Sequence, residues 1–436
     1  MNNTITYQYL RPQKAKRLEE WYHTGFYERK DLKIENYRNA VILPLKRFEG
    51  DNLLFGRGGV VDCNGEYVDT SAINRRVQFG YAFENEKYED KKVVYCGYLV
   101  KHWGHFLVEA VARLWYFLED DNSIDKYVFF RDESQSTDCY GNYREFLELL
   151  GVWDKVEIIN APTRYKEIIV PELGYKWREY YSECYKSIFE TISNNIQIKD
   201  EWKSFDKIFF TRTQLKGAQK KEFGYEMIDS FFHNNEYAII SPEKMSLSEL
   251  IYLIRNAKIC ASISGSLPHN MLFAKDNQTL VIVERVTMNN EIQVDVNIMK
   301  SLDVTYIDAN VALYPVDMGG PFIAAYSKEF EKYVENNKLI PPDKRFLTDG
   351  YMKNCFRKYM KSYKSIYGYQ WYMMDWYFEY IDYIWEAYQS GVEYFSDYIF
   401  RRKPYKVLEC FSVHFFIVFL KKAFKKLVGR NKYKKD

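Results

Sequence analysis

The sequence predicts an α/β protein with a doubly wound unit, a second α/β unit with a β-rich edge, a cleft between them and a helical C-terminal extension. Three observations lead to this prediction. Apolar strand-like runs alternate with helix-like runs over residues 207–310, a shorter alternation of the same kind spans 93–159, and the stretch 350–400 is rich in Tyr and Trp with helical spacing. A chain of 436 residues is long enough for two or three domains.

The second unit has the clearest pattern. Its expected strands are almost continuously apolar, as is typical of parallel strands that are covered on both faces. They lie at 207–210, 237–240, 258–263, 279–283 and 304–307. The expected helices between them lie at 222–234, 247–257, 269–274 and 292–301, and Ser246 with Glu249 forms a capping-box sequence before the second. This order predicts a Rossmann-like sheet.

The first unit is more mixed. Short, turn-rich strands are expected at 41–43 and 56–62, followed by strand 93–99, helix 103–119, strand 127–130, helix 142–150 and strand 156–159. We therefore expect four segments: an α/β unit at 1–200, the Rossmann-like unit at 201–315, a Pro- and Gly-containing linker at 316–349 and a helical extension at 350–436. Two such units suggest a ligand site in the cleft between them.

Composition narrows the possible functions and locations. The net charge of +2 argues against a general nucleic-acid binder. Seven scattered cysteines, with no Cys-x-x-Cys pair, fit a reducing compartment. The first residues have no basic-then-apolar signal pattern, so we expect a cytoplasmic protein. The last helix, 407–426, runs into a lysine-rich tail that predicts contact with an anionic membrane face, although a solvated tail remains the alternative.

The segment 102–109 is the first candidate for chemistry. His102, His105 and Glu109 are spaced so that they share one face if a helix starts near His102. Because histidine titrates near neutral pH, this arrangement at a strand-to-helix junction indicates proton transfer. A purely structural role, with the histidines packed at the helix start and Glu109 solvated, stays open.

A second candidate lies at the carboxyl ends of the strands in the second unit, where parallel sheets bind ligands. The turn after the third strand holds Ser264, Gly265, Ser266, His269 and Asn270 before a helix, which favours an anion site; a plain helix entry is the alternative. Three further candidates are Arg212, Lys216 and Glu284. A guanidinium suits a diphosphate, whereas Glu284 could take a ribose hydroxyl pair or simply pair with Arg285 at the surface.

Common metal and nucleophile templates are missing from the sequence. It has no Walker-type phosphate loop, no His-Glu-x-x-His helix and no Gly-x-Ser-x-Gly elbow. The nearest approach to an Asp-x-Asp pair is Asp295-Val296-Asn297. We therefore expect no metal and no other cofactor.

Four short motifs carry a resemblance to a known family. They are the turn 58–62 ending in Asp62, the segment 105–109 with 113–115, the strand 209–212 with Glu226, and the run of 242–243, Ser246, Ala257 and 265–273. Together they resemble glycosyltransferase family 61 and related bacterial capsular-polysaccharide transferases over residues 40–310. The family loop commonly reads His-Gly-Ala-Gly, whereas this chain has residues 264–267 as Ser-Gly-Ser-Leu and keeps Gly265 and Asn270.

The resemblance implies a fold and an activity. It implies the GT-B arrangement, with the nucleotide held by the second unit. The implied reaction is metal-independent, inverting transfer of a sugar from a nucleotide-sugar donor to a glycan or lipid-linked glycan acceptor. The implied role is capsule or cell-surface polysaccharide synthesis, on the inner face of the cytoplasmic membrane.

An inverting transfer needs a base for the acceptor and positive or N–H groups for the leaving diphosphate. The resemblance implies that His105, which lies in a family motif, is the first candidate for the base, with His102 second and Glu109 orienting it. The predicted donor site consists of Arg212, Lys216, Ser264, Gly265, Ser266, His269, Asn270 and Glu284. Asp62 and Arg113 are expected on the acceptor side.

Two other functions fit the same residues. One is a sugar-phosphate transferase for a phosphate-containing polysaccharide, which would use the same basic and histidine side chains. The other is a non-catalytic scaffold of a polysaccharide assembly complex, which the altered Gly loop and the long aromatic C-terminal region would suit.

Overall fold

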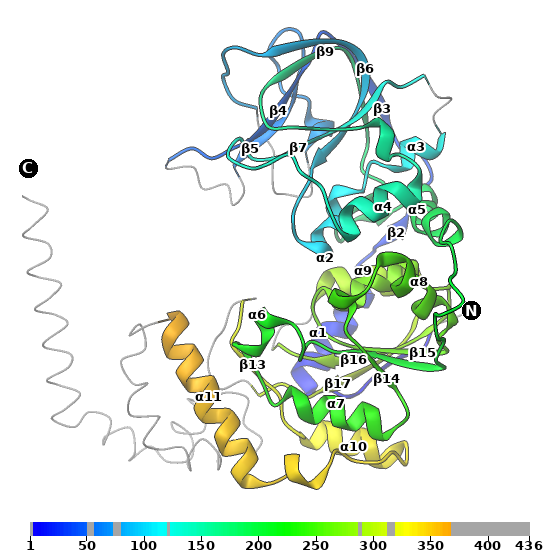
Figure 1. The fold of residues 1–436 in the computed structure, drawn as a ribbon, viewed down its shortest axis with the longest axis vertical. Coiled ribbons are helices and arrows are strands. Elements are labelled where there is room, and N and C mark those ends of the chain that lie inside the picture. Colours follow the sequence, from blue (N-terminus) through cyan, green and yellow to red (C-terminus); the bar gives the residue numbers. More distant parts are fainter. Residues whose placement is uncertain are drawn as a thin grey trace, which may run out of the picture.

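The computed structural model describes residues 3–49, 56–72, 80–119, 123–286, 290–311 and 319–367 (Figure 1). Within these ranges the protein is a mixed α/β structure with two large sheets, so the predicted fold class is confirmed at that level. The predicted amphipathic helix at 407–426 and its basic tail lie outside the described residues. No helix in the described ranges combines the length and apolarity that crossing a membrane requires.

The six-stranded sheet lies in the lower part of Figure 1. Its six strands are all parallel and run in the order β1-β17-β16-β15-β12-β14. Their bounds are β1 Ile5–Tyr9, β12 Lys207–Phe210, β14 Ala238–Ile240, β15 Ile259–Ile263, β16 Thr279–Glu284 and β17 Asp303–Asp308. The strands predicted in the second unit are thus confirmed, because near-continuous apolar runs suit a sheet covered on both faces.

Helices cover both faces of this sheet. On one face lie α1 Pro12–Tyr22, α8 Leu247–Asn256 and α9 Glu291–Met299, and on the other lies α7 Tyr225–Asn234. The short segments α6 Lys216–Gln219, η4 Pro242–Lys244 and η5 Leu267–Phe273 also belong to this unit. The Ser246 side chain accepts the Glu249 backbone N–H at 3.2 Å, which is the predicted cap of α8. Beneath the other face, α7 buries Ile228 and Phe231 in a cluster shared with Phe209 of β12.

Two segments join this sheet from unexpected positions in the sequence. β1 pairs with β17, with Ile5 opposite Val304, so the N-terminal strand lies outside the first sheet. Residues 319–349, expected as a linker, contain β18 Phe322–Ile323, α10 Lys328–Asn336 and η6 Lys344–Phe346. β18 pairs with β13 Glu222–Phe223, and α10 buries Phe330 in the same cluster as Phe209, so this stretch is an integral part of the second unit. The helix α11 Asp349–Tyr367 follows.

The other large sheet, in the upper part of Figure 1, is mixed. Its order is β5-β4-β9-β6-β7-β8, with β3 paired to β9; β6 is parallel to both β7 and β9. Its strands are β3 Ile34–Arg38, β4 Val41–Lys46, β5 Arg57–Val61, β6 Lys87–Tyr98, β7 Lys126–Phe130, β8 Val156–Ile159 and β9 Thr163–Pro171. A small sheet of β2 Tyr27–Glu28, β10 Tyr175–Lys176 and β11 Tyr180–Tyr181 lies apart from it.

The helical elements of the first unit lie largely on the side that faces the second sheet. They are η1 Asp69–Ser71, α2 Trp103–His105, η2 Phe106–Ala110, α3 Trp115–Glu119, α4 Asn142–Leu150, η3 Trp153–Lys155 and α5 Glu183–Asn194. In Figure 1, α2, α4 and α5 stand between the first sheet and helices α8 and α9. The two sheets are therefore joined through helices.

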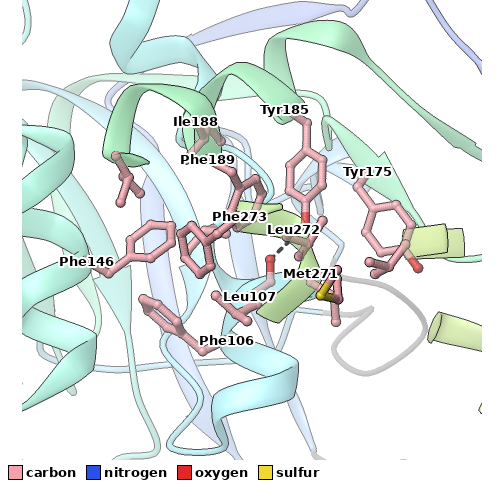
Figure 2. Packing of buried hydrophobic residues seen from close by; sticks show 14 of the residues in the cluster. Phe106, Leu107, Phe146, Tyr175, Tyr185, Ile188, Phe189, Met271, Leu272 and Phe273 are labelled. Carbon is pink, nitrogen blue, oxygen red and sulfur yellow. Dashed lines mark hydrogen bonds between the residues drawn. The ribbon is translucent and has the colours of Figure 1, made fainter. Parts of the chain in front are cut away.

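One hydrophobic core spans this junction. Figure 2 shows Phe106 and Leu107 of η2, Phe146 of α4 and Phe189 of α5 gathered around Phe273 of η5. Phe273 lies 5.3 Å from Phe189 and 6.2 Å from Phe146, measured between ring centroids. Nearby, the Tyr185 hydroxyl donates to the Leu107 carbonyl at 2.7 Å. The same cluster includes Val94 of β6 and Ile208 of β12, so both sheets share it.

Candidate functional site

The helix that follows β6 positions the predicted histidines. His102 precedes α2, and the chain then widens in η2, where the Val111 N–H bonds to the Phe106 carbonyl five residues back at 3.3 Å. Such widened turns are frequent at functional sites. The His102 and His105 rings lie 4.7 Å apart, and His105 Nδ1 lies 3.4 Å from Glu109 Oε1. The expected shared face of these three residues is confirmed.

Burial distinguishes the members of this group. Glu109 is 7% exposed and lies beneath His105, which is 26% exposed, while His102 is exposed. A carboxylate beside Nδ1 favours the tautomer that carries the hydrogen there, so Nε2 becomes the basic nitrogen of His105. The pair thus has the geometry of an oriented general base.

A third histidine reaches the same place from the second unit. His269 of η5 is buried, and a Cβ atom at Gly104 of α2 would lie only 3.0 Å from its ring and 2.9 Å from Ser266. Burial lowers the pKa of His269 to about 4, opposed by its bond to Gln293 and reinforced by His105 and His102. Three of the chain's six histidines therefore gather where the two units meet, and His269 is neutral there.

A buried chain of hydrogen bonds holds His269. Its Nδ1 lies 2.8 Å from Gln293 Oε1, and Gln293 Nε2 donates to Asn297 Oδ1 at 2.8 Å. Asn297 Nδ2 donates in turn to the hydroxyls of Tyr22 and Tyr306. Because the Gln293 amide nitrogen is a donor to Asn297, its oxygen accepts, and His269 carries its hydrogen on Nδ1. One tautomer is fixed, with Nε2 facing Asn290 at 3.5 Å.

Residues of the loop before η5 and of η5 itself are bonded within the second unit and, through Asn270, to the first unit. Asn270 is buried; its Oδ1 accepts the Trp103 indole N–H at 2.8 Å and its Nδ2 donates to the Leu267 carbonyl. Ser264 is also buried, and its hydroxyl accepts the Arg285 N–H at 2.8 Å. Ser264, His269 and Asn270, predicted as donor ligands, are therefore committed to internal bonds.

Gly265 and Ser266 are the members of this loop that are only half-buried. Gly265 has a φ of +132°, and a Cβ atom there would lie 2.9 Å from Arg285 Nη2. Glycine is needed because this backbone conformation is strained for other residues. The guanidinium of Arg285 thus packs directly on the predicted anion loop.

Arg212 and Arg285 share one carboxylate. Arg212 Nε lies 2.9 and 3.0 Å from the two Glu222 oxygens, and Arg285 Nη1 lies 2.8 Å from Glu222 Oε1. Glu222 is 5% exposed, and two guanidiniums against one carboxylate leave a net positive charge. Lys216, predicted as the second cation of this site, lies exposed at the start of α6. The second basic residue in contact with Glu222 is Arg285.

A pocket of about 540 Å³ opens beside Arg212 at the end of β12, and we name it the β12 pocket. It contains both hydrogen-bonding and aromatic side chains, as small-molecule sites do. Its lining residues are Arg212, Thr213, Gln214, Ala218, Gln219, Glu222, Phe223, Tyr225, Glu226, Asp229 and Lys358. Arg212 and Glu222 of the Arg212–Glu222–Arg285 cluster therefore line a cavity of ligand size, whereas Arg285 lies outside that lining.

Glu284 lies beneath this cluster, with 2% of its surface exposed. The alternative of a surface pair with Arg285 is wrong, because Glu284 is buried and Arg285 bonds to Glu222. Burial raises the pKa of Glu284 to about 7, with Lys14 opposing and Asp308 adding to the shift. Direct contact with a ribose would require Glu284 to become exposed.

Stability should fall with pH because of Glu284. Its folded pKa of about 7 exceeds the ordinary value of 4.5, so folding binds a proton that the unfolded chain releases between those pH values. We expect Glu284→Gln to remove this loss, so that the unfolding free energy of the variant rises relative to that of the wild type from pH 5 to pH 7; His269, whose folded pKa is lowered to about 4, acts in the opposite direction in both proteins. Urea denaturation at both pH values measures it. Asp295, with a pKa raised to about 6, retains part of the effect.

The control for this experiment is Glu236→Gln, since Glu236 is 88% exposed. It should leave the pH dependence of the unfolding free energy unchanged. The assignment of this pH effect to Glu284 is wrong if the unfolding free energies of Glu284→Gln and of the wild type change by the same amount between pH 5 and pH 7.

The two residues predicted on the acceptor side have structural roles. Arg113 is fully buried, and its guanidinium donates to the carbonyls of Pro171, Thr70 and Ala72, clamping η1 to the end of β9. Asp62 accepts backbone N–H groups in the turn after β5, chiefly that of Glu66, which lowers its pKa. Burial keeps Arg113 from direct contact with an acceptor in this conformation.

Three contributors to the site were missed in the sequence: Arg285, Glu222 and Gln293. Arg285 immediately follows a buried parallel strand, a position that carried a usable signal. Glu222 and Gln293 act through contacts across the fold and had no local signal. Within the described parts of the chain, no three His, Cys, Asp or Glu side chains gather as a metal site requires.

Comparison with known proteins supplies independent information about the same region. No match was found among curated proteins. A family model matches the chain from the first residue of α2 to a point within β16. The matched region contains His105, Glu109, Arg212, Glu222 and the loop before η5, and it begins one residue after His102. Residues 103–282 match the family model described as Glycosyltransferase 61, and this match implies glycosyltransferase activity with a nucleotide-sugar donor and a glycan acceptor.

Proposed function

We propose that this protein is an inverting glycosyltransferase of GT-B type that moves a sugar from a nucleotide-sugar donor to a glycan acceptor. The observation that carries the proposal is that an oriented histidine–carboxylate pair and two guanidiniums approach the Gly265–Ser266 turn from its two sides, with Gly104 packed on Ser266 and Arg285 packed on Gly265. The pair is His105 with Glu109, the guanidiniums are those of Arg212 and Arg285 around Glu222, and Arg212 also lines the β12 pocket. These groups are the base and the leaving-group site that the reaction needs.

The reaction would proceed as a single displacement. His105 Nε2 takes the proton of an acceptor hydroxyl while that oxygen attacks the anomeric carbon of the donor sugar. The bond from this carbon to the terminal phosphate oxygen breaks, and the electron pair leaves with the diphosphate. Attack from the face opposite the leaving group inverts the anomeric configuration. Glu109 holds the imidazole and stabilises it once protonated.

The donor would bind on the second unit. Its diphosphate competes with Glu222 for Arg212 and Arg285, which present planar, bidentate donors. The half-buried Gly265 and Ser266 border the same guanidinium, and the β12 pocket accommodates the nucleoside. Lys216, exposed on α6, stays a candidate for a further contact with the donor.

The acceptor and the cellular setting are inferred from the sequence. We place the protein at the inner face of the cytoplasmic membrane, in capsule or cell-surface polysaccharide synthesis. The lysine-rich stretch after residue 420 supports this location, because anionic lipid attracts clustered lysines. We propose that the reaction needs no bound metal; it should then proceed in EDTA.

A thermal-shift screen of nucleotides and nucleotide sugars tests the proposal, since a ligand that binds the native state stabilises it by mass action. A nucleotide hit followed by transfer of labelled sugar, with inverted configuration in the product, would support it. A phosphodiester in the product would replace it with sugar-phosphate transfer. No stabilisation by any nucleotide would favour a scaffold.

Removing one guanidinium should weaken nucleotide binding. We expect Arg285→Ala to raise the Kd of the nucleotide hit by roughly ten- to a hundredfold, because a charge-assisted bond to the diphosphate is lost. Arg212 still pairs with Glu222 in this variant, so the fold is retained. Isothermal titration calorimetry gives the Kd. Arg345→Ala, at a residue 75% exposed, is the control, and equal affinity in both variants would contradict the donor assignment.

A further inference from the structure

A second pocket, distinct from the β12 pocket, lies on the first unit. It has a volume of about 520 Å³ and is lined by Leu45, Lys46, Arg47, Asp132, Glu133, Ser134 and Gln135. We name it the β4–β7 pocket, because its two walls are the end of β4 and the segment after β7. The Leu45 N–H donates to the Arg131 carbonyl at 2.9 Å and the Glu133 N–H donates to the Leu45 carbonyl at 3.2 Å. The two walls are therefore fixed to each other.

The pocket shares a sheet edge with the histidine group. Strands β6 and β7 are parallel, with Tyr98 opposite Phe130, so the segments that follow them leave the sheet at the same edge. The segment after β6 leads to His102, whereas the segment after β7 forms the pocket wall. The Tyr98 hydroxyl bonds to Gln135, which joins the two segments directly.

The charges in this pocket balance. Lys46 and Arg47 face Asp132 and Glu133, and Lys46 Nζ lies 3.6 Å from Glu133 Oε2. A site for a nucleotide or another phosphate would need excess positive charge, as the Arg212–Glu222–Arg285 cluster provides. Balanced carboxylates, amide and hydroxyl groups suit instead a neutral ligand with many hydroxyl groups.

Two aromatic rings lie beside the β4 wall of this pocket. Phe48 is 39% exposed and packs edge-to-face on Tyr81 at 5.6 Å, with Lys46 5.8 and 5.5 Å from the two ring centroids. The Tyr81 hydroxyl donates to the Pro44 carbonyl at 2.9 Å, which holds the pair against β4. A partly exposed ring beside hydrogen-bonding groups offers an apolar face to a sugar ring and polar groups to its hydroxyls.

We propose that the β4–β7 pocket binds neutral sugar units of the acceptor glycan, remote from the bond that forms. This inference rests on the proposed transferase function. Binding energy from such remote units would hold the acceptor chain while its terminal hydroxyl reaches His105. Phe48 stacks on a sugar ring, and Asp132 and Glu133 accept hydrogen bonds from its hydroxyls.

An array of immobilised oligosaccharides tests this pocket with the full-length protein. The probes are defined chains of neutral hexoses, pentoses and N-acetylhexosamines, with uronic acid chains and a nucleotide as competitors. We expect binding to at least one neutral chain, weakened about tenfold by Phe48→Ala and by Glu133→Gln. Tyr88→Ala is the matched control, since Tyr88 is 56% exposed at the opposite end of β6 from Tyr98.

The outcomes separate this inference from the proposed function. His105→Ala should keep glycan binding. If the wild-type protein binds glycans through Phe48 and Glu133 but transfers no sugar, the pocket assignment stands and the transferase proposal is wrong. The pocket assignment is overturned if no neutral chain binds the wild type, if Phe48→Ala and Glu133→Gln bind as the wild type does, or if a nucleotide displaces the glycan from a Phe48-dependent site.

Discussion

Replacement of His105 by alanine should lower the rate of sugar transfer by about 10²- to 10⁴-fold, the usual contribution of a general base. The physical reason is the loss of the group that takes the acceptor proton. Nucleotide affinity should stay unchanged, because the Arg212–Glu222–Arg285 cluster lies on the other unit and does not use His105. Folding should also be retained, since His105 is a quarter exposed. Initial rates with labelled donor, together with the nucleotide Kd, measure both quantities.

Two further variants sharpen the test. Glu109→Gln should lower the rate less than His105→Ala, because the carboxylate acts by orienting the imidazole and does not itself take the acceptor proton. His233→Ala, at an exposed histidine on α7, is the matched control and should retain full activity. Undiminished transfer by His105→Ala would disprove the assignment, and selective loss in His102→Ala would move the role of base to His102.

The elements that sequence predicts best are those whose signals are local. Every boundary of β12, β15 and β16 lies within one residue of the boundary that the sequence predicts. The reason is that a buried parallel strand is a short, continuous apolar run bounded by polar residues. The cap at Ser246 was predictable for the same reason, since Ser246 and Glu249 are three residues apart.

Contacts between distant segments carry no such signal. β1 pairs with β17 across almost 300 residues, and nothing in the first ten residues indicates that partner. The same holds for the site. His102, His105 and Glu109 were found by helical spacing, whereas the pairing of Arg285 with Glu222 and of His269 with Gln293 depends on how loops fold over the sheet. Burial of Arg113 was equally hidden, because arginine is usually exposed.

The junction between the two units has consequences for how the site is held. Polar contacts cross it beside the shared core: the Glu145 carboxylate of α4 accepts the Leu247 and Ser248 N–H groups at the start of α8, at 2.8 and 2.9 Å. Glu190 of α5 pairs with Arg255 and Lys300, each at 2.9 Å. With Trp103 bonded to Asn270, these contacts hold the histidine group in register with the second sheet.

Phe273→Ala tests whether this junction makes the two units one cooperative structure. Phe273 is fully buried between Phe146 and Phe189, so its truncation should leave a cavity and lower the free energy of unfolding by about 3–5 kcal/mol. Because the core includes residues of both sheets, we expect the wild type and the variant each to unfold in a single transition, moved as a whole to lower urea. Circular dichroism and tryptophan fluorescence should report the same midpoint.

Phe205→Ala is the control, since Phe205 is 38% exposed and outside the shared core; it should change the unfolding free energy far less. Two separate transitions in the wild type would show that the sheets unfold independently and that the junction is weak. A single transition that Phe273→Ala splits in two would instead show that this ring couples the units. In the first case the junction would not fix the distance between His105 and the arginine cluster in the wild type, whereas in the second case that distance would be set by the junction in the wild type and released only in the variant.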